Sequence, residues 1–284
     1  MKTRTPHNQK DVGTETDLDI DPSARVLGAK IPLEAELLYV GGLGLVLYVI
    51  GLVADLHLLR LVAKPWPVVA LARWVLAVSR TKQRPELTTV AQALFLGACG
   101  DLLLEIDPSL FLFGLVAFLL GHLLYIVALH RETRGPEWVR SLPAFLYVAG
   151  MIAVLAPRLP ALLLGPVAVY AVVIGVVVFR AAARIGVPGL EPRWVRLGLL
   201  GAVLFTASDS LIAIDRFHTE LPGARYAIMG TYWAAQALLA LSLVHARRDE
   251  GVSPLLPAAY EATPLAPPPA SDPAAPPAGP DDAS

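Results

Sequence analysis

Residues 111–129 read FLFGLVAFLLGHLLYIVAL and contain no Asp, Glu, Lys or Arg. A helix that crosses the hydrocarbon core of a bilayer needs about 20 consecutive, mostly apolar residues. This stretch has that length and that composition. It is therefore predicted to be a membrane-spanning α-helix.

Seven further stretches share these properties. The complete set of predicted spans is Glu34–Leu56, Leu58–Ser79, Leu87–Leu104, Phe111–Leu129, Val139–Ala156, Pro160–Arg180, Trp194–Ile214 and Ala224–His245. The first two are almost contiguous, which predicts a tight turn near His57. The predicted fold class is all-α: a polytopic membrane helix bundle with eight transmembrane helices.

The composition of the 284-residue chain also favours a membrane protein. Hydrophobic residues make up 55% of it, charged residues 17%, and the mean hydropathy is +0.59. A soluble domain carries about 25% charged residues, so this chain has too little polar surface for that class. The net charge of −1 gives no reason to expect a nucleic-acid partner. The single cysteine, Cys99, excludes an intrachain disulfide and a cysteine-based zinc site.

Lysine and arginine are distributed unevenly between the predicted loops. One side of the membrane would carry most of the 23 basic residues, and the other would carry only Arg60, Lys64, Arg158, Arg216 and Arg225. Cytoplasmic loops are enriched in Lys and Arg. Both termini are therefore predicted to be cytoplasmic.

The two ends of the chain differ from the apolar segment between them. The first is polar and lacks a signal-peptide pattern, and the second is rich in Pro and Ala. We expect a disordered cytoplasmic arm (1–33), an eight-helix membrane domain (34–246) and a disordered cytoplasmic tail (247–284). The Ala/Arg/Pro/Val-rich composition is typical of a high-GC bacterium. The expected location is therefore the bacterial cell (inner or plasma) membrane, and no oligomeric state is indicated.

Among the ionisable residues of the predicted spans, three stand out: Lys64, Asp101 and Asp209. Such residues are costly in lipid and by default mark function. At about 1.5 Å of rise per residue, each lies about 21–23 Å from the cytoplasmic face, in the outer half of the membrane. We expect the three side chains to meet at one level. The alternatives are that the aspartates only hydrogen-bond neighbouring helices, and that Lys64 snorkels to the outer interface.

Further polar residues lie deeper in the predicted bundle. Some share a helix face because they are three or four residues apart. A polar pocket between the second, third, fourth, seventh and eighth helices would satisfy all of them. We therefore expect Asp101 and Asp209 to be catalytic, and the substrate-binding residues to be Lys64, His122, Tyr125, Ser208, Tyr232 and Gln236.

Three more carboxylates, Glu105, Asp107 and Asp215, end helices near the predicted outer surface. They are expected to be solvated there, rather than to take part in the site.

Two carboxyl groups in a site of low dielectric can take different protonation states. One can then donate a proton as general acid, while the other, ionised, activates water as general base. This pairing suits hydrolysis of an acid-labile bond and needs no metal or other cofactor. The alternative is a zinc site made by His122, Asp101 and Asp209, but only one histidine lies in the middle of the bundle.

Several short motifs occur in a fixed order along the chain. They include Lys64-Pro65, Ala98-Cys99-Gly100-Asp101, Gly121-His122, Ser208-Asp209-Ser210 and Tyr232-Trp233-Ala234-Ala235-Gln236. Together they resemble the YhhN family of lysoplasmalogenase-like membrane proteins, and the resemblance spans about residues 35–246. It implies eight helices and a lysophospholipid substrate. The implied reaction cleaves the vinyl ether bond of lysoplasmalogens to a fatty aldehyde and glycerophosphoethanolamine or glycerophosphocholine, with Asp101 and Asp209 as the catalytic pair.

Two other functions fit the same residues. Buried charges are also typical of transporters, so a small-solute or lipid transporter is one alternative. A non-catalytic membrane partner is the other. Aldehyde release would favour the hydrolase, and solute flux would favour the transporter.

Overall fold

The computed structural model describes residues 33–133, 135 and 138–247, and the regular structure in that part of the chain is helical, apart from one isolated bridge between Leu190 and Arg247. Residues 1–32 and 248–284, which hold nearly all of the two predicted tails, lie outside the described residues. The helices are α2 (Leu33–Val53), α3 (His57–Ala63), α4 (Trp66–Thr81), α5 (Leu87–Ile106), η1 (Pro108–Leu110), α6 (Phe111–His130), α7 (Trp138–Leu155), η2 (Ala156–Arg158), α8 (Ala161–Ala183), α9 (Pro192–Phe217) and α10 (Ala224–His245).

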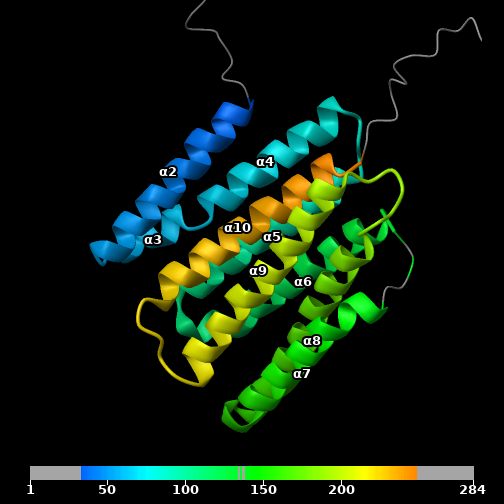
Figure 1. Cartoon of the computed structure of the whole chain (residues 1–284). Coiled ribbons are helices and arrows are strands. Elements are labelled where there is room, and N and C mark those ends of the chain that lie inside the picture. The colour runs from blue at the N-terminus through cyan, green and yellow to red at the C-terminus, as the bar shows by residue number, and fades with distance from the viewer. Residues whose placement is uncertain (1–32, 134, 136–137, 248–284) are drawn as a thin grey trace, which may run out of the picture. The chain divides into compact units, whose positions relative to one another are not determined.

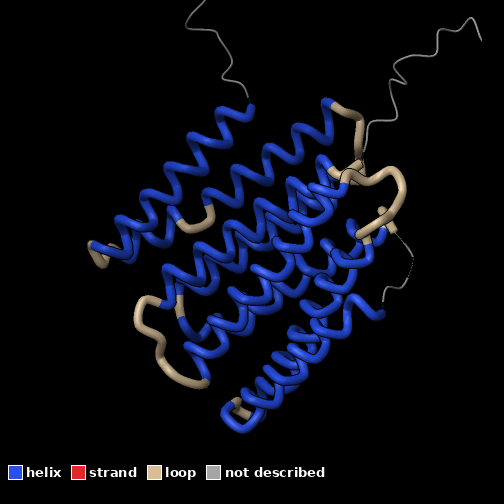
Figure 2. The backbone as a smooth tube through the Cα atoms, viewed as in Figure 1, coloured by secondary structure: helices blue, strands red, loops and turns tan. Residues whose placement is uncertain are grey.

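The prediction of an all-α fold is confirmed for the described residues (Figure 2). Six helical segments in this part of the chain are long and apolar enough to cross a membrane: His57–Thr81, Leu87–Ile106, Pro108–His130, Ala161–Ala183, Pro192–Phe217 and Ala224–His245. Two further apolar helices, Leu37–Val53 and Leu142–Arg158, are shorter.

The six longer segments are arranged in a closed ring, in which each contacts the next. Going round it, α4 contacts α5, α5 contacts α6, α6 contacts α8, α8 contacts α9, α9 contacts α10, and α10 returns to α4. The two shorter helices lie outside the ring, α2 against α4 and α7 against α8 (Figure 1). The interior enclosed by the ring is therefore where side chains of distant segments can meet.

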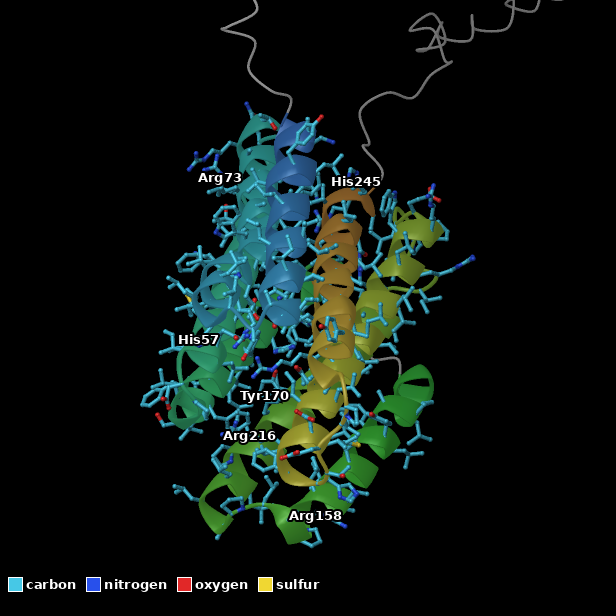
Figure 3. All side chains as sticks on the ribbon, turned by 90° about the vertical axis from the view of Figure 1, so that its left-hand side faces the viewer. His57, Arg73, Arg158, Tyr170, Arg216 and His245 are labelled. Carbon is cyan, nitrogen blue, oxygen red and sulfur yellow. The ribbon has the colours of Figure 1, made fainter. Side chains whose placement is uncertain are left out.

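The helices run between two ends of the bundle, which Figure 3 marks with labelled side chains. His57, Arg158 and Arg216 lie toward one end, which we call the His57 end. Arg73 and His245 lie toward the opposite end, which we call the His245 end. The loops that carry most of the basic residues between the helices are at the His245 end.

The second predicted span is broken where the sequence reads Lys64-Pro65. The structure divides it into α3 and α4, and the backbone N–H of Lys64 still donates to the carbonyl oxygen of Arg60 at 2.9 Å. Proline has no backbone N–H and its ring disturbs the preceding turn, so a helix interior rarely tolerates it. The break places Lys64, which is buried, at the junction of the two helices.

Helix α9 packs closely on α10 because one contact residue has no side chain. A β-carbon added at Gly201 would lie 3.0 Å from the carbonyl oxygen of Ala235 and 3.0 Å from Cβ of Leu238. Small residues at such contacts let helix backbones approach, which is the main source of packing energy between helices in lipid. This contact fixes α9, which carries Asp209, against α10, which carries Tyr232.

The His245 end is held together by buried ion pairs. Arg184 is fully buried, lies 2.6 Å from Oε2 of Glu132, and donates to the Ser242 hydroxyl at 2.8 Å. Arg247 lies 3.6 Å from Oε1 of the same glutamate. Burial raises the pKa of Glu132, and the charges of Arg184 and Arg247 oppose that rise. This cluster joins the ends of α6, α8 and α10 and is remote from both aspartates of interest.

Candidate active site

Asp101 of α5 is buried at the end of a chain of side-chain hydrogen bonds. The Tyr125 hydroxyl donates to Oε1 of Gln236 at 2.7 Å, and Nε2 of Gln236 donates to the Tyr232 oxygen at 3.2 Å. The Tyr232 hydroxyl in turn donates to Oδ2 of Asp101 at 2.9 Å. Asp101 is only 2% exposed, so its carboxyl group depends on these donors rather than on bulk water.

Asp209 of α9 has a different partner. Its Oδ2 accepts a hydrogen bond of 2.9 Å from the hydroxyl of Tyr170 on α8. The carboxyl group also lines a small cavity of about 50 Å³, whose other walls come from α5, α6, α8 and α9 and are apolar except for Tyr170. Apart from its partner Tyr170, Asp209 therefore faces an apolar space.

A row of aromatic rings connects the two aspartate-bound tyrosines. The His122 ring lies edge-on to Tyr170, with centroids 5.5 Å apart, and 4.4 Å from the centroid of Phe205. Phe205 in turn lies 5.5 Å from Tyr232. The two tyrosines that bond to the aspartates are thus connected through the rings of His122 and Phe205.

Phe118 of α6 lies between the Asp209 cavity and the hydrogen-bonded chain. Its ring lines that cavity and lies 5.8 Å, centroid to centroid, from Tyr232. It also packs on Gly100, where an added β-carbon would lie 2.6 Å from the ring. The glycine before Asp101 is therefore needed for Phe118 to take this position.

Lys64 does not bond to either aspartate. Its Nζ donates to Oε2 of Glu105 at 3.2 Å, and the Arg60 Nε donates to Oε1 of the same carboxylate at 3.1 Å. Lys64 is buried between helices and paired with this glutamate. The expectation that Glu105 is solvated is wrong, since its side chain is 7% exposed. Asp107, in contrast, is exposed.

The structure brings together some of the predicted site residues and separates others. Asp101, Tyr125, Tyr232 and Gln236 form one hydrogen-bonded group. His122 lies in the aromatic row: its Nδ1 is 2.7 Å from the Phe118 carbonyl oxygen, and its Nε2 has no partner among the described residues. Ser208 turns away and donates to the carbonyl oxygen of Ile228 at 3.0 Å, so it joins α9 to α10.

Sequence reasoning missed Tyr170 although a signal was present. Between Ala161 and Phe179 it is the only side chain with a hydrogen-bonding group. A lone polar group in an otherwise apolar span is as informative as a buried charge. Because Tyr170 was overlooked, the expected pocket omitted the sixth predicted helix. The carboxyl group of Asp209 in fact bonds to that helix through Tyr170.

The zinc alternative has no support in the geometry. No three His, Cys, Asp or Glu side chains in the described part of the chain lie close enough together to share a metal ion. His122, Asp101 and Asp209 each have other neighbours, as described above.

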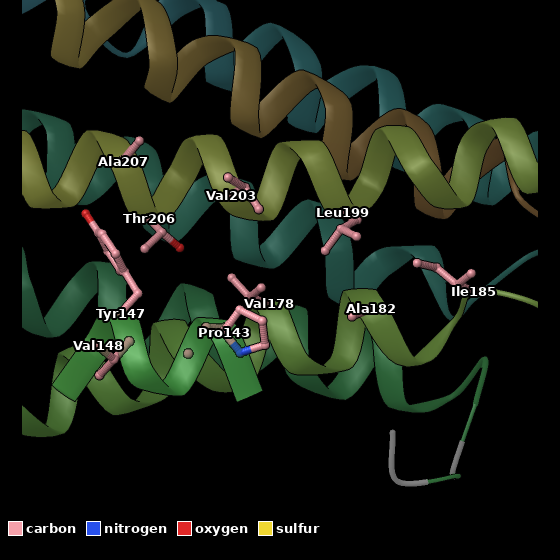
Figure 4. A pocket seen from close by; sticks show the side chains of 12 residues that line it. Pro143, Tyr147, Val148, Val178, Ala182, Ile185, Leu199, Val203, Thr206 and Ala207 are labelled. Atoms are coloured by element: carbon pink, nitrogen blue, oxygen red, sulfur yellow. The ribbon is translucent and has the colours of Figure 1, made fainter. Parts of the chain in front are cut away.

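A larger cavity of about 570 Å³ lies between α7, α8 and α9 (Figure 4). It runs along α9 from Leu199 to Ala207, two residues before Asp209. Its lining is apolar except for Tyr147 and Thr206, and the Tyr147 hydroxyl donates to the Ser210 hydroxyl oxygen at 2.9 Å. Its volume is in the range of small-molecule sites.

Comparison with known proteins places the chain among membrane proteins of one family. The model of the YhhN family matches residues 59–243, a segment that contains both aspartates. The chain is 36% identical to Lysoplasmalogenase TMEM86A of Bos taurus over 166 residues, which cover 57% of this chain and 68% of the relative. It is 34% identical to Lysoplasmalogenase TMEM86B of Homo sapiens over 176 residues (62% and 71%).

A bacterial relative matches as well. The Lysoplasmalogenase of Mycobacterium bovis is 35% identical over 173 residues, which cover 57% of this chain and 63% of the relative. No solved structure matches the chain significantly.

Proposed function

This chain belongs to the YhhN family, and on that premise we propose that it is a membrane hydrolase that cleaves the vinyl ether bond of lysoplasmalogens. The observation that carries the proposal is the similarity, at about 35% identity, to mammalian and mycobacterial proteins that are named lysoplasmalogenases. The products would be a fatty aldehyde and glycerophosphoethanolamine or glycerophosphocholine.

The proposed reaction uses the two aspartates in different roles. A carboxylic acid adds a proton to the β-carbon of the vinyl ether, which leaves an oxocarbenium ion at the α-carbon. A carboxylate removes a proton from water as the water oxygen bonds to that α-carbon. The resulting hemiacetal transfers its hydroxyl proton to the glycerol oxygen and separates into aldehyde and alcohol. One water is consumed, and a proton must return to the acid before the next turnover.

We assign Asp209 as the acid and Asp101 as the base. The alkene is apolar, and Asp209 is the carboxyl group that faces an apolar cavity. Asp101 lies instead at the end of the hydrogen-bonded chain from Tyr125, where a water molecule could be oriented by polar neighbours. The Nε2 of His122, which has no partner within the described residues, is available to such a water or to a substrate oxygen.

The remaining candidate residues support these two. Tyr232 and Gln236 hold the Asp101 carboxyl group in place, and Tyr170 holds that of Asp209. The cavity between α7, α8 and α9 is proposed to receive the hydrocarbon chain, because it is apolar and approaches Asp209 along α9.

We also propose that α2 and α7 cross the membrane with the six longer segments, which gives eight spans. Both termini would then be cytoplasmic, and the His57 end would face outward. The bacterial cell membrane is the proposed location. A reporter that is active only in the cytoplasm, fused after Arg247, would be silent if this orientation is wrong.

Fatty-aldehyde release from a lysoplasmalogen by the purified protein tests the function. Asp101→Asn and Asp209→Asn should each abolish release, and EDTA should not. Asp107→Asn and Asp215→Asn are matched controls, because each stands six residues after one of the proposed catalytic aspartates and accepts a hydrogen bond from a backbone N–H near a helix end, that of Ser109 or Leu221. Release that survives in both Asp101→Asn and Asp209→Asn would end the proposal of an aspartate pair.

A further inference from the structure

We propose that a cluster of charged side chains at the His57 end binds the phosphate of the lysophospholipid. The cluster consists of Asp55, Arg60, Lys64, Glu105 and Arg225, and we call it the Glu105 cluster. The inference rests on the proposed function, because that function supplies a substrate that carries a phosphate.

Glu105 is the centre of the cluster. Its Oε1 lies 3.1 Å from Nε of Arg60 and 3.7 Å from the Arg225 guanidinium, and its Oε2 lies 3.2 Å from Nζ of Lys64. The side chains of Arg60, Lys64 and Glu105 are all at most 10% exposed. One carboxylate thus holds three cations that come from α3, from the α3–α4 break and from α10.

The charges of the cluster do not balance. Three cations face two carboxylates, and the second carboxylate, Asp55, is 94% exposed although it lies 2.8 Å from the Arg60 guanidinium. The cation in excess is Arg225, whose side chain is 60% exposed and lies 3.7 Å from Oε1 of Glu105. An anion from outside would complete the cluster, and guanidinium and ammonium groups pair well with phosphate oxygens.

The distance between the Glu105 cluster and Asp101 also matches the distance between the phosphate and the vinyl ether of a lysoplasmalogen. Glu105 follows Asp101 by four residues on α5, so the two share a helix face about 6 Å apart along the axis. Lys64 bonds to Glu105 at 3.2 Å and therefore lies beside the same end of α5. In a lysoplasmalogen the three carbons of glycerol separate the vinyl ether oxygen from the phosphate ester, a span of about one helical turn. A phosphate at the cluster would therefore place the vinyl ether beside Asp101.

Arg225 gives the cluster an open side. Its side chain is 60% exposed, whereas Arg60 and Lys64 are enclosed. A phosphate that approaches from the His57 end can reach Arg225 first and then the enclosed cations. The exposed position of Arg225 also makes it suitable for substitution, because its replacement leaves the enclosed pairs intact.

Binding of three ligands to the purified full-length protein tests the inference. The first is a lysophospholipid with a saturated ether chain, which cannot undergo vinyl ether hydrolysis. The second is the alkylglycerol with the same chain and no phosphate, and the third is inorganic phosphate. Displacement of a fluorescent lysophospholipid measures all three, with Arg225→Gln and Lys64→Gln as the test variants. Arg158→Gln is the matched control, since Arg158 is exposed at the same end and bonds only within its own helical segment.

We expect Arg225→Gln and Lys64→Gln each to weaken binding of the ether lysophospholipid about tenfold, the usual effect of losing one charge-assisted contact. Alkylglycerol binding should not change, and Arg158→Gln should bind like the wild type. Equal binding of the lysophospholipid and the alkylglycerol by the wild type would overturn the inference. Inorganic phosphate that competes as well as the lysophospholipid would also overturn it, in favour of a site for free phosphate.

The outcome is separable from that of the proposed function. A wild-type protein that binds the ether lysophospholipid through Arg225 but releases no aldehyde from a lysoplasmalogen would keep the phosphate site and remove the hydrolase. Aldehyde release with binding that does not depend on Arg225 or Lys64 would remove the phosphate site alone.

Discussion

Replacing Tyr232 by Phe removes the hydrogen-bond donor of Asp101 and little else. The ring that packs against Phe118 and Phe205 is retained, so the shape of the site is conserved. What is lost is the 2.9 Å bond to Oδ2 of Asp101 and the acceptor for Nε2 of Gln236. The substitution therefore tests whether the hydrogen-bonded chain positions the proposed base.

The size of the effect follows from the contacts. A hydrogen bond to a charged group contributes about 1.5–3 kcal/mol. If that energy is lost from the transition state, the rate falls about tenfold to 100-fold, at about 1.4 kcal/mol per factor of ten. Leaving the buried Gln236 amide unpaired should also lower the free energy of unfolding by about 1–3 kcal/mol.

The assay is steady-state fatty-aldehyde release in detergent, with the thermal unfolding midpoint measured on the same samples. The fall should be in kcat rather than in KM, because Tyr232 acts on Asp101 and not on the lipid. Tyr226→Phe is the control, since it removes an exposed tyrosine hydroxyl from the same helix, α10. If Tyr232→Phe retained wild-type kcat while Asp101→Asn was inactive, the positioning role would be refuted.

Three other substitutions test separate parts of the account. Gly100→Ala should displace Phe118 into the Asp209 cavity, because the added methyl group would meet the ring at 2.6 Å; lower activity with a folded protein by circular dichroism is the expected result. Val203→Trp should narrow the apolar cavity and slow hydrolysis of long-chain lysoplasmalogens more than short-chain ones, while equal slowing would separate the cavity from the hydrocarbon chain. Arg184→Met should leave the buried Glu132 with only its longer contact to Arg247 and lower stability by up to about 3–5 kcal/mol; an unchanged unfolding midpoint would contradict that interpretation of the ion pair.

The helices were predictable because lipid imposes length and composition on each one. Apolar runs of about 20 residues predicted the described helices closely, except that one continuous span was expected where the structure has α3 and α4 separated at Lys64-Pro65. The order of helices around the ring was not predictable. It depends on which helix faces with small residues pack together, such as the face of α9 that carries Gly201 against α10. Many helices of this chain have a face with equally small residues, so the sequence does not single out one pairing.

Most residues of the candidate site could be predicted from the sequence, but which of them bond to one another could not. Asp101, Tyr232, Gln236 and Tyr125 were named from burial cost and helix spacing, and the structure joins them. Helix spacing gives the face of a residue but not the rotation of one helix against another. Ser208 therefore could not be distinguished from its neighbour Asp209, although only the aspartate faces a cavity.

The burial of Glu105 could have been predicted from the spacing of charged residues along the sequence. It follows Asp101 by four residues, and Lys64 follows Arg60 by four, so each pair lies on one helix face. Two such pairs at the same end of a bundle favour a shared ion cluster over solvation. Glu105 was nevertheless predicted to be solvated, because it lies near a helix end and helix ends are usually exposed to water.

Aldehyde release in deuterated water tests the central claim most directly. Released aldehyde is reduced at once with borohydride, before carbon-bound hydrogen can exchange, and the alcohol is analysed by mass spectrometry. Protonation of the vinyl carbon by an aspartic acid in equilibrium with solvent predicts one deuterium on carbon 2 of the chain, and no product from Asp209→Asn. Product without deuterium at that carbon, or product formed by Asp209→Asn at the wild-type rate, would contradict the account.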